Sequence, residues 1–258
     1  MSRPFDSIGR RLPHGWRDLI LQLGLFFFAY QGYQLVRGLV DGRASEAYAN
    51  AARVVDLERG LGAFFEPGFQ QSMLAHRWLI DAADWMYVNS HFVVTTTFLA
   101  WLYLFRNRHF AFVRNMFLVA MGLALVGYAL FPTAPPRLLP GDGFTDTIAS
   151  FTNLAQDGHV ASLLINKYAA VPSMHCGFAL MVSGTMVSIV RNPAGRVLWA
   201  LYPLVVFGVV VVTGNHFWFD GFIGALVAGA SALVAHRLLA RFRPEDWSFR
   251  RGDVEAPA

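Results

Sequence analysis

Apolar residues gather in long runs that predict helices crossing a membrane. Six runs lie at about 17–37, 84–105, 111–131, 173–190, 197–214 and 216–239. Each is close to the roughly 20 apolar residues that a spanning helix needs. Between the first two runs, residues 44–62 place apolar groups at helical spacing among charged ones, which predicts helices along the membrane interface. The predicted fold class is all-α: a polytopic membrane helix bundle of about six transmembrane helices plus interfacial helices.

Residues 1–258 are expected to form a single membrane domain, because the chain shows no internal repeat and no second block of different composition. The catalytic core is expected at about 45–240. Residues 243–258 are rich in charge and are expected to form a flexible cytoplasmic tail. The first apolar run is retained as a span, since no small-residue cleavage pattern follows it.

Composition places the chain in a membrane. Hydrophobic residues make up 55% of it and charged residues only 15%, which is too apolar for a soluble domain. The net charge of +4 comes from basic residues beside apolar runs, where anionic lipid headgroups are the natural counter-charge, so no nucleic-acid partner is expected. Arginine replaces lysine almost throughout, which is typical of a GC-rich bacterial genome. We therefore expect an integral protein of the bacterial plasma membrane.

The basic residues are divided unequally between the two sides of the predicted bundle. With six spans, fourteen of the 21 basic residues fall on the side that holds both termini, and seven fall on the other. Basic residues are retained in the cytoplasm, so both termini are expected to be cytoplasmic. Residues 38–83, the loop 132–172 and the turn at 214–215 then face outward. We expect the active site among them, at the extracytoplasmic face.

Asp220 is an acidic residue in a predicted span, where a charge costs at least about 2.5 kcal/mol. His216 lies four residues earlier, and this separation places both side chains on one face of a helix. A carboxylate at one ring nitrogen fixes the tautomer and raises the basicity of the other, which makes the imidazole a nucleophile or a base. The structural alternative is that His216 caps a helix and Asp220 merely partners it.

The sequence Val-Pro-Ser-Met-His at 171–175 begins the fourth predicted span. Proline suits the first turn of a helix, and the backbone N–H groups that follow it favour an anion. His175 is placed to donate a proton to a leaving oxygen, while Ser173 and nearby backbone donors hold phosphate oxygens. The structural alternative is a plain helix start with a solvated histidine.

Arg137 follows the third span in a proline-rich segment, Phe-Pro-Thr-Ala-Pro-Pro-Arg at 131–137. The prolines stiffen the helix exit and hold the guanidinium near the membrane face, where its planar fork suits a phosphate. The alternative is an interfacial arginine that snorkels. Lys167, the only lysine, lies eight residues before His175 and is a candidate second phosphate ligand. Among the other histidines, His91 has no companion residues in the sequence.

Together these segments resemble the type 2 phosphatidic acid phosphatase superfamily, and the flanking sequence is most similar to its branch of inositol phosphorylceramide synthases. The resemblance covers roughly residues 45–240. Residues 172–175 match the family's Pro-Ser-x-His signature, and His216 to Asp220 match its terminal His-x-x-x-Asp signature. The segment 132–137 takes the place of the first signature.

The resemblance implies a reaction mechanism. His216, activated by Asp220, is expected to attack phosphorus and form a phosphohistidine, while His175 protonates the leaving group as the general acid. The residues expected to bind the phosphate are Arg137, Ser173 and Lys167. No cofactor and no metal are expected. The expected function is a membrane lipid-phosphate phosphatase, whose partners are the lipid-linked phosphate substrate and the bilayer.

The chain departs from the phosphatase pattern at two cation positions. Leu130 stands where the family has a lysine, and Val209-Val210 stand where it has Ser-Arg. These differences favour an alternative: a phosphotransferase that moves a phospho-headgroup, such as phosphoinositol, from a lipid to a polyol acceptor such as inositol. A diester donor carries less charge and needs fewer cations.

An alternative of another class is a non-catalytic lipid-binding or transport protein, in which the two histidines and the aspartate form a proton relay or an open zinc site.

Overall fold

The computed structural model describes residues 12–152 and 168–238, and throughout these residues the chain is helical apart from turns and loops. The α-helices are α2 Gly15–Val40, α3 Ala44–Gly60, α4 Glu66–Leu74, α5 Arg77–Trp85, α6 His91–Phe105, α7 Asn107–Leu130, α8 Thr147–Thr152, α10 Met174–Ile189, α11 Pro193–Val212 and α12 Trp218–Leu233. Two π-helical turns occur at Met86–Ser90 and Val234–Leu238, and two 3₁₀ turns at Pro136–Leu138 and Pro140–Asp142. The all-α fold class predicted from the sequence is confirmed.

Within the part of the chain that the structure describes, five helical segments are long and apolar enough to cross a membrane: Gly15–Val40, Arg77–Phe105, Asn107–Leu130, Pro193–Val212 and Trp218–Leu238. The protein is therefore an integral membrane protein, and these segments correspond to five of the six predicted spans. The sixth prediction, at 173–190, coincides with α10, which is apolar but has only 16 residues. Such a helix rises about 24 Å, less than the roughly 30 Å hydrocarbon layer.

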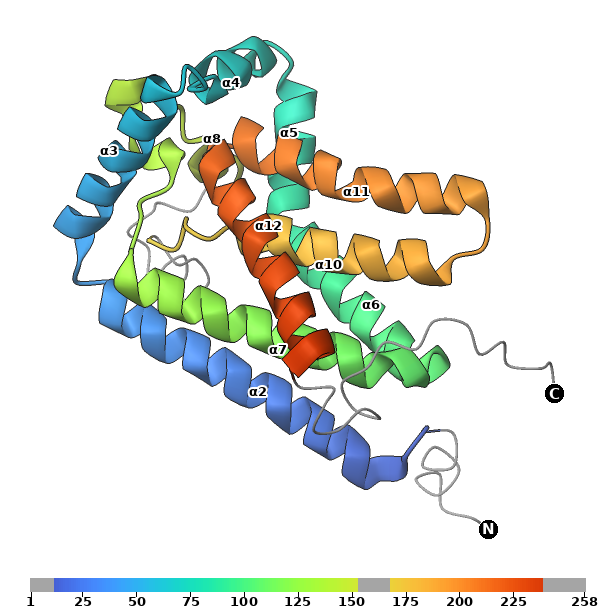
Figure 1. Cartoon of the computed structure of the whole chain (residues 1–258). Helices are drawn as coiled ribbons and strands as arrows, with labels where there is room; N and C mark the ends of the chain where they lie inside the picture. The colour runs from blue at the N-terminus through green and yellow to red at the C-terminus, as the bar shows by residue number, and fades with distance from the viewer. Residues whose placement is uncertain (1–11, 153–167, 239–258) are drawn as a thin grey trace.

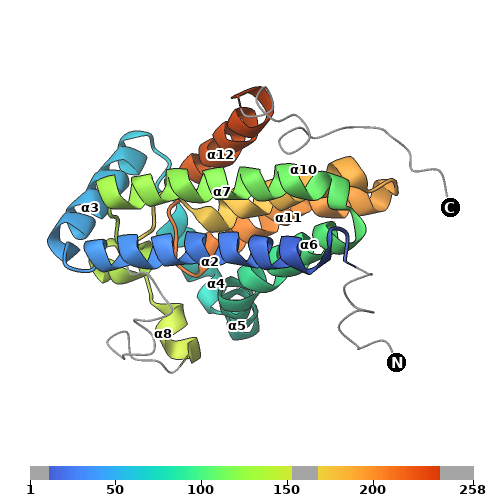
Figure 2. The same cartoon turned by 90° about the horizontal axis from the view of Figure 1, so that it is seen from below.

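The spans form a bundle in which helices distant in sequence lie together. Figure 1 shows α10 and α11 as an antiparallel hairpin, with α12 crossing α10 and α7 diagonally. Figure 1 and Figure 2 both show α2 running beside α7, and in Figure 1 α2 lies along the lower edge of the bundle. The main core lies where α6, α7, α10 and α12 meet, and Leu102, Val113, Ala120 and Val182 are almost completely buried there.

The helices α3, α4 and α8, which are not among the candidate spans, gather at one end of the bundle together with the proline-rich loop after α7 (Figure 1). Helix α3 lies in the segment for which interfacial helices are predicted. Its buried face follows the helical repeat through Ala47, Ala51, Val54 and Val55. These residues pack with Phe217, which precedes α12, so α3 is part of the structure around the start of α12.

Helices α10 and α12 approach each other closely because glycines face each other at their crossing. A Cβ atom on Gly224 would overlap the carbonyl oxygen of Ser173, and one on Gly177 would lie 3.1 Å from the carbonyl oxygen of Gly224. No larger side chain fits between the two backbones. Since both helices begin near this crossing, their first turns are brought together.

Candidate active site

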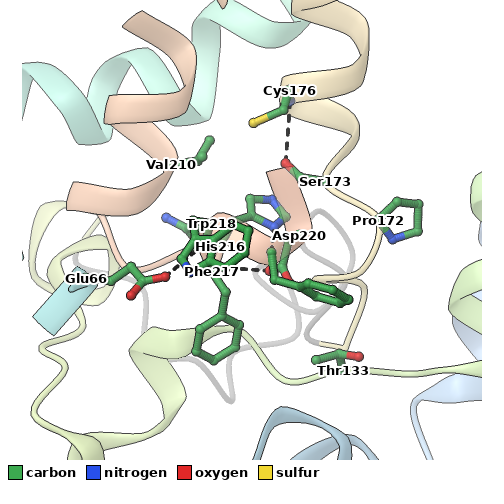
Figure 3. Close-up of polar contacts among 12 residues, drawn as sticks. Glu66, Thr133, Pro172, Ser173, Cys176, Val210, His216, Phe217, Trp218 and Asp220 are labelled. Atoms are coloured by element: carbon green, nitrogen blue, oxygen red, sulfur yellow. Dashed lines mark hydrogen bonds and ion pairs between the residues drawn. The ribbon is translucent and has the colours of Figure 1, made fainter. Parts of the chain in front are cut away.

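His216 and Asp220 meet at the start of α12. The His216 Nδ1 atom lies 3.3 Å from Asp220 Oδ2, and the same oxygen accepts a hydrogen bond of 3.0 Å from the backbone N–H of Phe217. Asp220 is fully buried and His216 is 4% exposed. Figure 3 shows the two side chains together beside the first turn of α12. With Nδ1 held by the carboxylate, Nε2 is the ring nitrogen left for chemistry.

The sequence predicts His216 inside the sixth helix, but α12 begins two residues later, at Trp218. The turn from α11 places His216 instead. Gly214 has a φ of +65°, and the N–H groups of Asn215 and His216 both donate to the carbonyl of Val210, at 3.0 and 3.1 Å. A left-handed glycine is a common helix end, because it lets the chain turn back onto the final carbonyls.

His175 lies opposite this pair, in the first turn of α10. Its ring centroid is 5.7 Å from that of His216. The helix carrying it is tied directly to α12, because the N–H of Ser173 donates to the carbonyl oxygen of Asp220 at 3.0 Å. The two signature segments, more than forty residues apart in the printed sequence, are thus hydrogen-bonded to each other.

Ser173 is the N-cap of α10. Its Oγ accepts a hydrogen bond of 3.4 Å from the N–H of Cys176, and the residue is fully buried (Figure 3). This arrangement is typical of a serine at a helix start. The hydroxyl proton is left to donate to an acceptor placed beside the helix end.

Arg137 comes from the loop after α7, as the sequence predicts, but it is buried rather than lying at the surface: 7% of the residue is exposed. Its Nε donates to Asn215 Oδ1 at 2.8 Å, and its backbone N–H donates to Gly214 O at 2.7 Å. Its Nη1 is 3.5 Å from Asp146. These contacts fix the guanidinium against the turn that carries His216.

His91 is a site residue that its place in the sequence does not indicate. Its ring centroid lies 4.3 Å from that of His175, and the ring stacks on Phe178 at 5.2 Å. The Tyr87 ring stacks on the His175 ring, with their centroids 4.5 Å apart, and the backbone of Tyr87 forms a hydrogen bond with the His175 side chain. The signal available was the spacing of four between Tyr87 and His91, which puts them on one helix face.

Comparison with known protein families shows a match to the PAP2 superfamily over residues 52–234. The chain belongs to the PAP2 superfamily. This is the superfamily of type 2 phosphatidic acid phosphatases, and membership implies phosphatase-type activity on substrates that carry phosphate. Comparisons with curated proteins and with solved structures gave no match.

The PAP2 match spans the helices that build the site, from the middle of α3 to the start of the final π-helical turn. Lys167 and the tail 243–258 lie outside the described residues, so the structure gives no position for this candidate phosphate ligand. Within residues 12–152 and 168–238, no group of three or more His, Cys, Asp and Glu side chains is arranged to hold a metal ion.

Proposed function

We propose that this PAP2 superfamily protein is a lipid-phosphate phosphatase that works through a phosphohistidine at His216. The observation that carries the proposal is the arrangement of His216 between Asp220, at 3.3 Å from Nδ1, and His175, whose ring centroid is 5.7 Å away on another helix. Asp220 orients and activates His216 as the nucleophile, and His175 faces His216 across the position where a phosphate would bind. Nucleophile, orienting carboxylate and proton donor are the parts that covalent catalysis needs.

In the first step, His216 Nε2 forms a bond to phosphorus while the bond from phosphorus to the lipid oxygen breaks. Protonated His175 gives its proton to that oxygen, and Asp220 stabilises the positive charge on the phosphorylated imidazole ring. In the second step a water oxygen attacks phosphorus and the P–N bond breaks. His175 takes the proton of that water, which restores both histidines and releases inorganic phosphate.

Arg137 and the first turn of α10 supply the positive environment for the phosphate. Among the described residues, the structure records partners for Nε and Nη1 of Arg137 but none for its Nη2. The guanidinium therefore retains a donor for a phosphate oxygen, and the backbone N–H groups at the start of α10 add the favourable end of the helix dipole. Ser173 is the neighbouring hydroxyl donor.

A second candidate function is phosphotransfer to an alcohol, as in the inositol phosphorylceramide synthase branch. It is favoured by the two missing cations. Val210 is 1% exposed and packs with Val206 and Cys176, while Leu130 is largely exposed on α7. A donor that is a phosphodiester carries one negative charge and suits a site with a single described arginine. The acceptor hydroxyl of a polyol such as inositol then replaces water in the second step.

The topology proposed with this function places both termini in the cytoplasm of a bacterium and the site at the extracytoplasmic face of the plasma membrane. Support comes from the asymmetry of the basic residues in the sequence. Leu61→Cys, in the segment 38–83, and Arg191→Cys, between α10 and α11, place cysteines at exposed positions on the two sides of the bundle. Both are labelled in intact cells with a membrane-impermeant reagent to test this orientation. Labelling of Leu61→Cys alone is expected, and labelling of Arg191→Cys alone would reverse the topology.

The test of the chemistry uses purified protein in detergent with phosphate-labelled lipid monoesters and diesters, with and without inositol. His216→Ala is expected to lose at least about 10³-fold in turnover and all acid-labile label on the protein. His175→Ala is expected to slow leaving-group departure by about 10²–10⁴-fold, less for a substrate whose leaving group needs no proton.

The acceptor separates the two functions. Release of inorganic phosphate without inositol supports the phosphatase, whereas turnover that requires inositol and yields a phosphoinositol lipid supports the transferase. If His216→Ala and His175→Ala match the wild type on every substrate, the catalytic assignment is wrong, and a non-catalytic lipid-binding or transport role takes its place.

A further inference from the structure

Two glutamates outside the signature segments contact the first turn of α12. Glu66 Oε1 accepts a hydrogen bond of 2.9 Å from the N–H of Trp218, and Glu58 Oε1 accepts one of 3.1 Å from the N–H of Phe219. Both glutamates are fully buried. Figure 3 shows Glu66 directed at this turn, on the opposite side from Asp220. The two N–H groups belong to residues between His216 and Asp220, so these contacts act on the backbone that joins them.

The sequence brings the two glutamates together through a tight turn. Glu58 lies in the last turn of α3, and Glu66 is the first residue of α4. Between them Gly62 adopts a φ of +66°, and the N–H of Ala63 donates to the backbone carbonyl of Glu58 at 2.8 Å. A residue with a Cβ is strained at such a φ, so Gly62 lets the chain fold back and bring the carboxyl groups to one place.

The remaining carboxyl oxygens of this pair have no ordinary donor. Oε2 of Glu58 and Oε2 of Glu66 are buried, and among the described residues no hydrogen-bond donor reaches either of them. A side-chain hydrogen bond with Glu66 is among the causes that raise the pKa of Glu58. Two carboxylates are both acceptors, so this contact requires a proton between them. The pair then carries one negative charge instead of two.

Burial and the nearby negative charges both favour the protonated form of Glu58. Burial raises the pKa of Glu58 from 4.5 to about 9, with further contributions from the charge of Glu66, the hydrogen bond to Glu66 and the charge of Asp220. Glu66 on α4 and Asp220 on α12 are the charged groups that face Glu58 from neighbouring elements. Its neighbour on α3, Arg59, instead pairs with Asp142 at 2.7 Å.

We propose that Glu58 and Glu66 are a positioning pair for the reaction: they share one proton, hold the first turn of α12 and thereby fix His216 relative to His175. The inference rests on the proposed role of His216. The single negative charge of the pair suits the positive end of the α12 dipole. A second charge would place three carboxylates around one helix turn and repel Asp220 from its position. Neither glutamate touches the substrate.

The first test compares substitutions that keep or remove the shared hydrogen bond. In Glu58→Gln the amide oxygen still accepts from Phe219 N–H and the NH₂ group donates to Glu66, so kcat is expected to stay within about 3-fold of wild type. Glu58→Leu leaves the Glu66 oxygen without a donor, and kcat is expected to fall about 100-fold with KM changed less than about 3-fold. Glu46→Leu, on the exposed face of α3, is the matched control and is expected to retain wild-type kcat.

The second test is the pH profile. As Glu58 of the wild type loses its proton at about pH 9, the added charge is expected to disturb the first turn of α12, and kcat is expected to fall with it. Glu58→Gln has no such proton, so this alkaline fall is expected to disappear. A residue that merely fills space would leave the profile where it is.

A third measurement does not depend on activity. Because folding raises the pKa of Glu58 from 4.5 to about 9, the folded chain holds one more proton than the unfolded chain between these values. The thermal stability of the wild type is therefore expected to fall as pH rises through this window, more steeply than that of Glu58→Gln. Parallel curves for the two proteins would overturn the shared proton.

The outcomes separate this inference from the proposed function. If His216→Ala is inactive while Glu58→Leu folds and keeps wild-type kcat, or Glu58→Gln keeps the alkaline fall, the positioning pair is wrong and the phosphohistidine stands. If His216→Ala is as active as wild type, the proposed function is wrong, and the stability curves alone decide whether the proton is shared. Should Glu58→Leu fail to yield folded protein, the pH profile of Glu58→Gln decides.

Discussion

The two ends of α12 are built differently. At its first turn, the N–H groups of Trp218 and Phe219 donate to buried glutamates, and the carbonyl of Asp220 accepts from the backbone of α10. In its second half, small residues such as Gly229 and Ala232 face a groove of about 810 Å³ shared with α7 and α10. That half ends in the π-helical turn Val234–Leu238, with Arg237 at the groove.

This difference separates two structural demands on one helix. The first turn must hold Asp220 in a fixed geometry against His216, which precedes the helix, since displacement by about 1 Å can cost about 10²-fold in rate. The second half needs only an apolar surface of suitable length, which the bilayer accepts in many shapes. Changes near Asp220 should therefore alter catalysis, whereas changes near Gly229 should not.

The largest effect is expected from Asp220→Asn. The amide oxygen can still accept the hydrogen bond from Phe217 N–H, so the helix start is kept. An amide cannot stabilise positive charge on His216, and kcat is expected to fall about 10³-fold or more. Steady-state kinetics on the same lipid phosphates measure this. Activity within 3-fold of wild type would show that Asp220 serves the fold alone.

A smaller effect is expected from Gly224→Ala, with Gly229→Ala as its matched control on the same helix. The new methyl group at 224 overlaps the carbonyl of Ser173, so α10 and α12 must separate. We expect a loss of about 1–3 kcal/mol in stability and about 10–100-fold in kcat.

The control Gly229→Ala should reduce neither stability nor kcat. Nothing lies within 4 Å of a Cβ on Gly229, and alanine is the better helix former by roughly 0.5–1 kcal/mol. Equal or improved thermal stability with unchanged kcat is the expected result for Gly229→Ala. If both alanines reduce kcat equally, the two halves of α12 are not distinct.

The smallest effect in this series is expected from Ser173→Ala, with Ser231→Ala as its matched control. Ser173→Ala removes the N-cap of α10 and a hydroxyl beside the proposed phosphate position, so kcat should fall about 10-fold and stability by about 0.5–2 kcal/mol. Ser231, also fully buried, donates to Ala228 O at 2.8 Å within the second half of α12. Ser231→Ala should leave kcat within 2-fold. An equal loss in both would remove Ser173 from the site.

The fold class and the paired signatures were predictable because their signals are local. Long apolar runs indicate spans directly, and the separation of four positions from His216 to Asp220 places their side chains within reach of each other whether or not the helix includes both. The exact helix start was less predictable: α12 begins at Trp218, because the left-handed turn at Gly214 comes first. Helix ends depend on such turns more than on hydrophobicity.

The contacts that join distant segments could not be read in the same way. Glu66 lies 152 residues before its partner Trp218, and nothing in a single sequence links the two. Glu58 did leave a signal, since it continues the buried stripe of α3 from Ala51 and Val55 at helical spacing. An acidic residue on an apolar face indicates a buried partner rather than solvent.

The span Arg77–Phe105 contains a π-helical turn at Met86–Ser90, and this turn rotates the second half of the span about the helix axis relative to the first half. An α-helix advances about 100° per residue, so one additional residue in a turn rotates everything after it relative to what came before. The half with Asp84 and the half with His91 can therefore each present an inward face that a uniform helix would not align. A deletion of Asn89 would restore the regular repeat and rotate one half away from the bundle. The packing of this span in the bundle therefore fixes its length to within one residue, although the bilayer itself tolerates differences of several residues in length.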